Sequence, residues 1–326
     1  MYKIISNTLI IYPNFNEPLE IINALNTNIY DKNNNSINTI LFSNYKKLEC
    51  IETTHNKYDE TYTHLFVRNR FNNPIQYLPS MITHLILGGK FNNIISNNIN
   101  SIEYIEFYGE YNYPIDDLPD SIKEINLYGW EFQQPINKLP ANLLYLNFSG
   151  SSNKFNKPIN NYNNKLIKLD FESSEFNHPL NNLPSSLKIL ILSDKFNQPV
   201  ENLPCSIEII KFGNKFNNSV DFLPNSIKEL YLGEKFSQRL DNLPNSIIQL
   251  NIKQKNISNI QTLMNLPNSI KILSFDLTSC SDYSNFHSSN KEKIKISPTV
   301  QKVILDNSSL KKIFELCEQT QFVYKK

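Results

Sequence analysis

Two histidines hold the same place in neighbouring segments of this sequence and are the first candidates for metal chemistry. His64 stands in Thr-His-Leu-Phe-Val, and His84 stands in Thr-His-Leu-Ile-Leu. If these segments are adjacent strands, about 4.8 Å apart, the two imidazoles could stack or share a metal ion. A protein metal site normally has three or more ligands, so a ladder of solvent-facing rings is the favoured interpretation and no metal is expected.

Catalytic chemistry finds no support in the motifs of the chain. The sequence has no GxGxxG, P-loop, HExxH, CxxC or nucleophile-elbow motif. Its glycines number only seven, which is few for a phosphate-binding loop, and no isolated pair of carboxylates suggests general acid–base work. We therefore predict no enzyme, no catalytic residue and no cofactor.

A group of aromatic residues is the best candidate for a binding site. Its members fall within three consecutive copies of a sequence repeat and are Tyr104, Tyr108, Tyr128, Trp130 and Tyr145. Tyr and Trp are enriched where partners dock, because they bury a large area with little loss of side-chain entropy. Two other interpretations stay open. The rings could stack across strands for stability alone, or they could reflect the abundance of Tyr, which occurs 17 times.

These residues are positioned by a block of about twenty residues that recurs down most of the chain. Each copy carries an aromatic residue, and successive ones are 20 to 23 residues apart: Phe71, Phe91, Tyr111, Phe132, Phe155, Phe176, Phe196, Phe216 and Phe236. Fourteen residues after each of them begins an apolar-x-apolar pair, from Leu85/Leu87 to Leu250/Ile252. Self-similarity of this kind predicts a solenoid, in which each repeat buries its apolar side against its neighbours.

The apolar-x-apolar pairs predict short strands with one buried face, and the residues between them exclude helices. Most copies have a proline three positions after the aromatic residue and another eight positions after it, as at Pro199 and Pro204. Prolines at this density predict an extended or turned return path. Length varies only between a strand and the next aromatic residue, as at 151–153 and 172–175, so we expect surface loops there.

An asparagine follows the aromatic residue in most copies: Asn72, Asn92, Asn112, Asn156, Asn177, Asn197 and Asn217. An amide side chain can both donate and accept hydrogen bonds. Stacked in successive coils, these amides could pair with loop backbone that would otherwise lack partners. The fixed placement predicts an asparagine ladder.

The two ends of the chain depart from the regular spacing. Leu9/Ile11 and Ile40/Phe42 resemble strands of degenerate copies, and Val303/Leu305 resembles a last strand. A short helix is expected after Ser308 or Ser309 and through Glu318, with these residues on one face: Leu310, Ile313, Phe314 and Cys317. Such a helix would cover the open end of the stack.

We therefore expect one continuous structural domain in three parts. Residues 1–60 would hold degenerate N-terminal repeats that act as a cap, residues 61–280 the regular solenoid, and residues 281–326 the last strand and the helical cap. A parallel sheet would line one face, and the proline-rich return segments would line the other.

Phe-Asn-x-Pro-Ile, the centre of the repeat, resembles the signature of FNIP repeats, a subgroup of leucine-rich-repeat-like sequences. It stands here as Phe71-Asn72-Asn73-Pro74-Ile75 and Phe155-Asn156-Lys157-Pro158-Ile159, and Leu-Pro-x-Ser-Ile-Lys follows at 118–123 and 223–228. The resemblance covers residues 61–280. It implies a mainly β, right-handed, leucine-rich-repeat-like solenoid that binds proteins, of the kind found in amoebae and in giant viruses.

Many proteins with such repeats carry an N-terminal F-box, which implies recruitment of substrates to a ubiquitin ligase. Residues 1–60 of this chain show strand-like segments in place of a helical F-box pattern. The leading hypothesis is therefore a non-catalytic module that presents its sheet to a protein partner. The ubiquitin-ligase adaptor, argued from the resemblance alone, is the alternative.

Composition limits the other partners and the compartment. The formal net charge is +1 with both signs mixed, which does not favour nucleic acid. No apolar run reaches the length of a membrane span. The cysteines, at 50, 205, 280 and 317, follow no disulfide pattern. We expect a cytoplasmic protein, in the host cytoplasm if the chain is viral, and the sequence does not indicate an oligomeric state.

Overall fold

The computed structural model of the chain describes residues 2–5, 8–11, 39–42, 64–67, 72, 74–75, 78, 82–150, 153–159, 161–253, 266–276, 294–295, 297–305, 314–315 and 320–324. By their internal contacts, the residues form two compact units, Met1–Leu166 and Ile167–Lys326. They are called unit 1 and unit 2, and each is described by itself.

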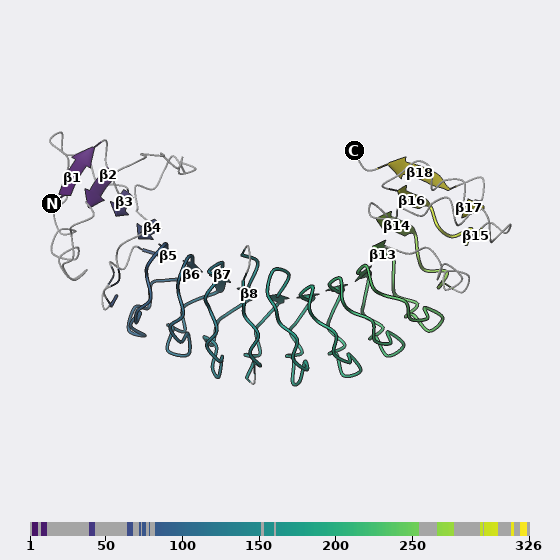
Figure 1. The fold of residues 1–326 in the computed structure, drawn as a ribbon, viewed down its shortest axis with the longest axis horizontal. Helices are drawn as coiled ribbons and strands as arrows, with labels where there is room; N and C mark the ends of the chain where they lie inside the picture. The colour runs from purple at the N-terminus through teal and green to yellow at the C-terminus, as the bar shows by residue number, and fades with distance from the viewer. Residues whose placement is uncertain are drawn as a thin grey trace. The chain divides into compact units, whose positions relative to one another are not determined.

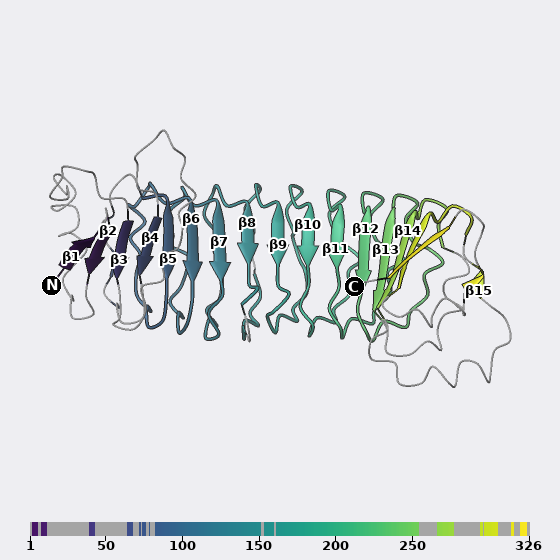
Figure 2. The same ribbon diagram turned by 90° about the horizontal axis from the view of Figure 1, so that it is seen from above.

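Unit 1 is built on a sheet whose strands follow one another in chain order (Figures 1 and 2). They are β1 (Tyr2–Ile5), β2 (Thr8–Ile11), β3 (Thr39–Phe42), β4 (His64–Val67), β5 (His84–Leu87), β6 (Tyr104–Phe107), β7 (Glu124–Leu127) and β8 (Tyr145–Asn147). The first pair, β1 and β2, is antiparallel, and the later neighbours are parallel. The strands expected at Leu9/Ile11 and Ile40/Phe42 are confirmed as β2 and β3.

Unit 2 repeats this plan with a second run of parallel strands (Figure 1). They are β9 (Lys168–Asp170), β10 (Ile189–Ile191), β11 (Ile209–Lys211), β12 (Glu229–Leu232), β13 (Gln249–Lys253), β14 (Ile272–Asp276), β16 (Lys302–Leu305) and β18 (Gln321–Tyr324). A separate pair, β15 (Ile294–Lys295) with β17 (Phe314–Glu315), is also parallel. The strand predicted at Val303/Leu305 is confirmed as β16, but it is not the last one, because β18 pairs beyond it.

Successive coils are in register, so equivalent residues stack on one another. Ile105 pairs with Ile125 and Phe107 with Leu127 in unit 1, and Leu230 pairs with Leu250 in unit 2. The apolar residues of each strand are buried, and the residues between them are more exposed, as the alternating pattern of β5 and β12 shows. The predicted mainly β solenoid is confirmed, with the core on one face of the sheet.

The repeated aromatic residues form the second buried column of each unit. In unit 1 the ring centroids of Phe91 and Tyr111 are 6.0 Å apart, and those of Tyr111 and Phe132 are 6.2 Å apart. In unit 2 Phe196 lies 6.3 Å from Phe176 and 6.2 Å from Phe216. The planes are close to parallel, so each ring is covered on both faces by the rings of the neighbouring coils.

The return path contains no helix among the residues that the structure describes. It is extended, with parallel β-bridges between Ile75 and Ile95 and between Ile136 and Ile159, and the residue after the first proline is buried, as at Ile115 and Val200. Absence of helices follows from the two prolines, each of which removes a backbone donor and fixes φ.

The asparagine ladder is confirmed along the return path. In unit 1 the Oδ1 atom of Asn92 accepts the backbone N–H of Asn112 at 2.9 Å. In unit 2 the Oδ1 atoms of Asn177 and Asn197 accept the N–H groups of the equivalent residues one coil later, at 2.9 and 2.8 Å. A serine ladder that the sequence reading did not anticipate runs beside it, with Ser226 Oγ donating to the carbonyl oxygen of Ile207 at 2.6 Å.

Two loops of variable length are more buried than expected. Asn153 and Ser174 are 1% and 4% exposed. The Nδ2 atom of Asn153 donates to the carbonyl oxygen of Leu127 at 2.7 Å, and Ser174 Oγ donates to that of Phe171 at 2.8 Å. The expectation of surface loops is therefore wrong at these two residues, because their side chains fold inward and satisfy backbone that the extra length leaves unpaired.

The helix expected between residues 308 and 318 is not confirmed. Phe314 and Glu315, in the middle of that range, form β17 and pair with β15. The rest of the range, including Leu310, Ile313 and Cys317, lies outside the described residues. Strand pairing has prevailed over the helical periodicity at these two positions, since an extended segment can add to neighbouring backbone.

Candidate interaction face

The outer face of the sheet in unit 1 carries the predicted aromatic residues together with acids and amides. Side chains alternate along a strand, so those that do not enter the core gather on this face. The cluster over β6–β8, called here the tyrosine–glutamate face, consists of Tyr104, Glu106, Tyr108, Glu124, Asn126, Tyr128, Tyr145 and Asn147. Tyr108 and Tyr128 follow their strands directly, and their N–H groups extend the ladder by donating to the carbonyl oxygens of Leu87 and Phe107.

Glu106 lies between two tyrosines of the same strand and interacts with both. The Tyr104 hydroxyl donates to its Oε1, and the Tyr108 side chain lies close enough for the carboxylate to affect its pKa. Burial, followed by the nearby Glu106 carboxylate, raises the pKa of Tyr108 to about 12. Burial and the hydrogen bond to Glu106 raise the pKa of Tyr104 as well. Both hydroxyls therefore keep their protons at neutral pH, and that of Tyr104 is a donor to Glu106.

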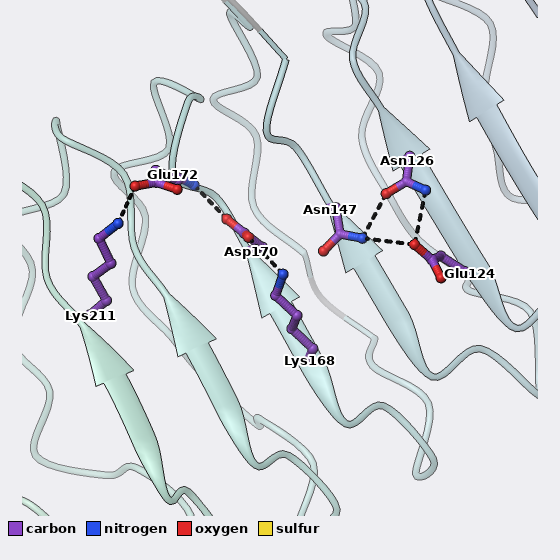
Figure 3. Close-up of polar contacts among 7 residues, drawn as sticks. All are labelled: Glu124, Asn126, Asn147, Lys168, Asp170, Glu172 and Lys211. Carbon is purple, nitrogen blue, oxygen red and sulfur yellow. Dashed lines mark hydrogen bonds and ion pairs between the residues drawn. The ribbon is translucent and has the colours of Figure 1, made fainter. Parts of the chain in front are cut away.

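A network of amides surrounds the second acid, Glu124 (Figure 3). The Nδ2 atom of Asn126 donates to Glu124 Oε1 at 3.0 Å. The Nδ2 atom of Asn147 donates to Asn126 Oδ1 at 2.6 Å and is 3.5 Å from Glu124 Oε1. Asn126 and Asn147 are only 1% and 7% exposed, although they lie on the outer face. The Oδ1 atom of Asn147 is buried and has no hydrogen-bond partner among the described residues.

The two acids differ from the other glutamates of these coils in having no basic partner. Glu103, Glu110 and Glu131, at the edges of the coils, form ion pairs with lysines of neighbouring coils. No ion pair within the described residues includes Glu106 or Glu124; their partners are tyrosine hydroxyls and amides. The face therefore keeps two carboxylates that no lysine or arginine of the described residues neutralises.

The structure brings together some of the predicted residues and separates others. The Tyr108 and Tyr128 rings are in contact, with centroids 5.2 Å apart. Tyr104 and Tyr145 share a column of the sheet, but Glu124 lies between them. Trp130 is 44% exposed and Tyr108 41%, while Trp130 has no ring contact within the described part of the chain. Tyr108 and Tyr128 thus form a pair of rings on the face, and Trp130 is exposed two residues beyond Tyr128.

His64 and His84 are directly opposite each other on β4 and β5, as predicted. The ring of His84 lies 5.2 Å from that of Tyr104, and its Nδ1 atom is 2.8 Å from Thr83 Oγ1. Within the described residues, no group of three or more His, Cys, Asp or Glu side chains could hold a metal ion. The ring of His84 thus extends the column that contains Tyr104.

The outer face of unit 2 is organised differently, since its first acids have basic partners (Figure 3). Asp170 is paired with Lys168 of its own strand at 3.0 Å. Glu172 is paired with Lys211, and its N–H donates to Asp170 Oδ1 at 3.0 Å. Further on, Tyr231 donates to Glu229 Oε2 at 2.9 Å, which together with burial, the larger cause, raises the pKa of Tyr231 to about 12.

Sequence reasoning missed the polar residues in the centre of the face. Glu106 and Asn126 are the middle residues of the apolar-x-apolar pairs Ile105/Phe107 and Ile125/Leu127. The strand period already places these residues outward, so their polar character was an available signal. The prediction used only the columns that flank each pair, and only their aromatic residues, which is why it found the tyrosines and neither Glu106 nor Glu124.

The repeats of this chain are similar to those of a known family. The FNIP repeat model matches residues 111–151, 176–215, 196–235 and 216–255. The four matches, in both units, show that the chain contains FNIP repeats, and its fold is that of a leucine-rich-repeat-like solenoid. No curated protein matches the sequence at a significant level.

One solved structure shares the fold at low sequence identity, and another is more distantly similar. CroV588, described as a novel circular LRR protein, is 23% identical with a TM-score of 0.60 over 99% of this chain. This chain spans 44% of the length of CroV588. YopM from Yersinia enterocolitica is 15% identical over 81% of this chain and 59% of its own, with a TM-score of 0.44.

Two further expectations from the sequence bear on partners. Segments β1, β2 and β3 are extended within residues 1–60, where a ligase adaptor would need the helices of an F-box. A search of the described residues for a helix long and apolar enough to cross a membrane finds none.

Proposed function

We propose that the protein is a non-catalytic module that binds another protein through the tyrosine–glutamate face of unit 1. The observation that carries the proposal is that the side chains of Tyr108 and Trp130 are 41% and 44% exposed. Polar side chains lie beside them on a sheet whose strands are held in register by backbone pairing. Large aromatic residues that stay accessible on a rigid scaffold are typical of protein contact sites.

Cross-strand stacking for stability gives no reason for the exposed ring of Trp130. The buried aromatic column already stacks coil on coil, whereas Trp130 makes no ring contact within the described residues. The large repetitive surface of a solenoid is also the kind of surface that such proteins use for binding. The partner would cover the exposed sides of Tyr108, Tyr128 and Trp130.

The test is to replace Tyr108, Tyr128 and Trp130 together by Ala and to compare partner capture from cells with that of the wild-type chain by quantitative mass spectrometry. We expect the triple variant to unfold at nearly the wild-type urea concentration and to lose a partner that the wild type retains. The control replaces Phe222 and Ile248, which are 66% and 46% exposed elsewhere in the chain, by Ala. Equal capture by the triple variant and the wild type, or equal loss in the control, would contradict the proposal.

A further inference from the structure

The tyrosine–glutamate face has more hydrogen-bond acceptors than its own donors satisfy. The hydroxyl of Tyr104 is directed to Glu106, and the amide nitrogens of Asn126 and Asn147 are directed to Glu124 and Asn126. An ionised carboxylate offers about four acceptor positions on its two oxygens and no donor. The acceptors left over belong to Glu106, Glu124 and the Oδ1 atom of Asn147, which has no partner within the described part of the chain.

The outer positions of β5–β8 supply no lysine or arginine to meet these acceptors. From β5 to β8 these positions are held by His84, Ile86, Tyr104, Glu106, Glu124, Asn126, Tyr145 and Asn147. Lys123 precedes Glu124 in the sequence, but its Nζ atom is paired with Glu103 at 2.9 Å. His84 is a diagonal neighbour of Glu106 across the strands, but its ring lies against Tyr104 and its Nδ1 atom is 2.8 Å from Thr83 Oγ1.

The geometry of the two acids suits a cation that lies between aromatic rings. Glu106 pairs with Asn126 across the strands, so Glu124, two residues before Asn126, is its diagonal neighbour. Strand spacing and rise put their backbones roughly 8 Å apart, a gap that two glutamate side chains and one guanidinium can bridge. Along the chain, Tyr108 is two residues after Glu106, and Tyr128 is two residues after Asn126. A cation near the face of an aromatic ring is attracted by the quadrupole of the ring.

From these relationships we infer that the protein partner presents a basic, arginine-containing peptide segment, whose guanidinium group binds Glu106 and Glu124 while neighbouring residues of the segment cover Tyr108, Tyr128 and Trp130. The inference rests on the proposed function and adds the chemistry of the partner. Arginine fits better than lysine, since it has five donors in a planar fork and packs flat against tyrosine rings. An anionic partner, such as a nucleic acid or an anionic lipid surface, would bring like charge to two unpaired carboxylates.

The experiment selects binders from a display library of random short peptides with the purified full chain as bait. Selected peptides are then synthesised with a fluorophore, and their dissociation constants are measured by fluorescence anisotropy. The test variant replaces Glu106 and Glu124 by Gln. The matched control replaces Glu103 and Glu110 by Gln, which makes the same change in net charge at two acids that have lysine partners.

We expect arginine to be enriched in the selected peptides relative to the input library. The dissociation constant should rise at least about tenfold for E106Q/E124Q, the loss expected for a charge-assisted hydrogen bond, and less than about threefold for the control, where the charges are exposed. Replacing the peptide's arginine by lysine should weaken binding, and replacing it by glutamate should abolish it.

Three results would overturn the inference: selection without arginine enrichment, wild-type affinity in E106Q/E124Q, or an equal loss in both double variants. Failure of the inference is distinguishable from failure of the proposed function. If a cellular partner is lost from the Tyr108/Tyr128/Trp130 variant but retained by E106Q/E124Q, the face binds a protein and the arginine contact is wrong. If the aromatic variant retains every partner, the proposed function itself is wrong.

Discussion

Asn197 links its own coil to both neighbouring coils of unit 2. Its Oδ1 atom accepts the N–H of Asn217 at 2.8 Å, and its own N–H donates to Asn177 Oδ1 at 2.9 Å. Asn218 also donates to it at 3.0 Å. One amide side chain thus satisfies backbone on the return path, where prolines prevent a regular ladder.

Replacement of Asn197 by Ala should lower the free energy of unfolding by about 1 kcal/mol, because the N–H of Asn217 loses its acceptor while water can still reach this exposed site. Urea denaturation followed by circular dichroism measures the change. The matched control is Asn202→Ala, at an exposed residue for which no hydrogen bond is found within the described part of the chain. An equal effect at both positions would show that the ladder contributes nothing specific.

The aromatic column should contribute far more to stability than an exposed ring of the same type. Phe196 is fully buried and lies between Phe176 and Phe216, so Phe196→Ala removes contacts on both ring faces and leaves a cavity. We expect a loss of about 3–5 kcal/mol. Phe222→Ala, at a side chain that is 66% exposed, should change stability by less than about 0.5 kcal/mol. Thermal and urea unfolding of the two variants would settle the comparison.

Close approach between coils makes Gly109 intolerant of any side chain. Its φ is +67°, and a Cβ atom there would lie 2.1 Å from the carbonyl oxygen of Gly89. Gly109→Ala should therefore cost at least about 2 kcal/mol from strain and from separation of the two coils. The adjacent change Glu110→Ala removes only an exposed ion pair with Lys90 and should cost less than about 1 kcal/mol. A Gly109→Ala protein as stable as the wild type would contradict the packing described here.

Alkaline pH should destabilise the protein through its buried tyrosines. Burial raises the pKa of Tyr162 above the ordinary value of 10.0, so the folded chain holds this proton more tightly than the unfolded chain. The stabilisation that Tyr162 contributes is thus fully present below its pKa in the unfolded chain. It is lost as the pH rises through its pKa in the folded chain. Between about pH 9 and pH 11 the unfolding free energy of wild-type protein should fall more than that of Tyr162→Phe.

Measurement of urea midpoints at several alkaline pH values tests this difference. Tyr324→Phe, at a residue that is 42% exposed, is the control and should follow the wild type. If Tyr162→Phe and the wild type lose stability in parallel, burial of Tyr162 does not govern the alkaline response.

The fold was predictable wherever the sequence pattern repeats from coil to coil. The two-residue period of apolar positions predicts the strands, and the prolines predict the extended return path. The repeat of about twenty residues predicts the buried aromatic column and the Asn177–Asn197–Asn217 contacts, because each coil has nearly the same sequence pattern as the one before it. The C-terminal end was not predictable in this way. Periodicity around Phe314 suits a helix in isolation, and only tertiary pairing with Ile294–Lys295 selects the strand.

The candidate site was predictable in part. Aromatic residues such as Tyr108 and Trp130 are recognisable by type, and the strand period placed Tyr108 on the outer face, with Trp130 in the loop that follows Tyr128. The unpaired state of Glu106 and Glu124 could not be read from the sequence. It depends on which lysines reach which acids across the coils, as Lys123 reaches Glu103, and on amide orientations that only the packed structure defines.

The constant register between coils has a consequence for how such proteins change over time. Removing residues 197–216 would join Phe196 to Asn217, and the Oδ1 atom of Asn177 would then meet the N–H of Asn217 in place of that of Asn197. Every interlocking partner would be replaced by its equivalent, so a whole coil can be gained or lost by unequal recombination without remaking a core. Length is therefore the property that selection can adjust most cheaply in this architecture, while the side chains on the outer sheet remain free to diversify.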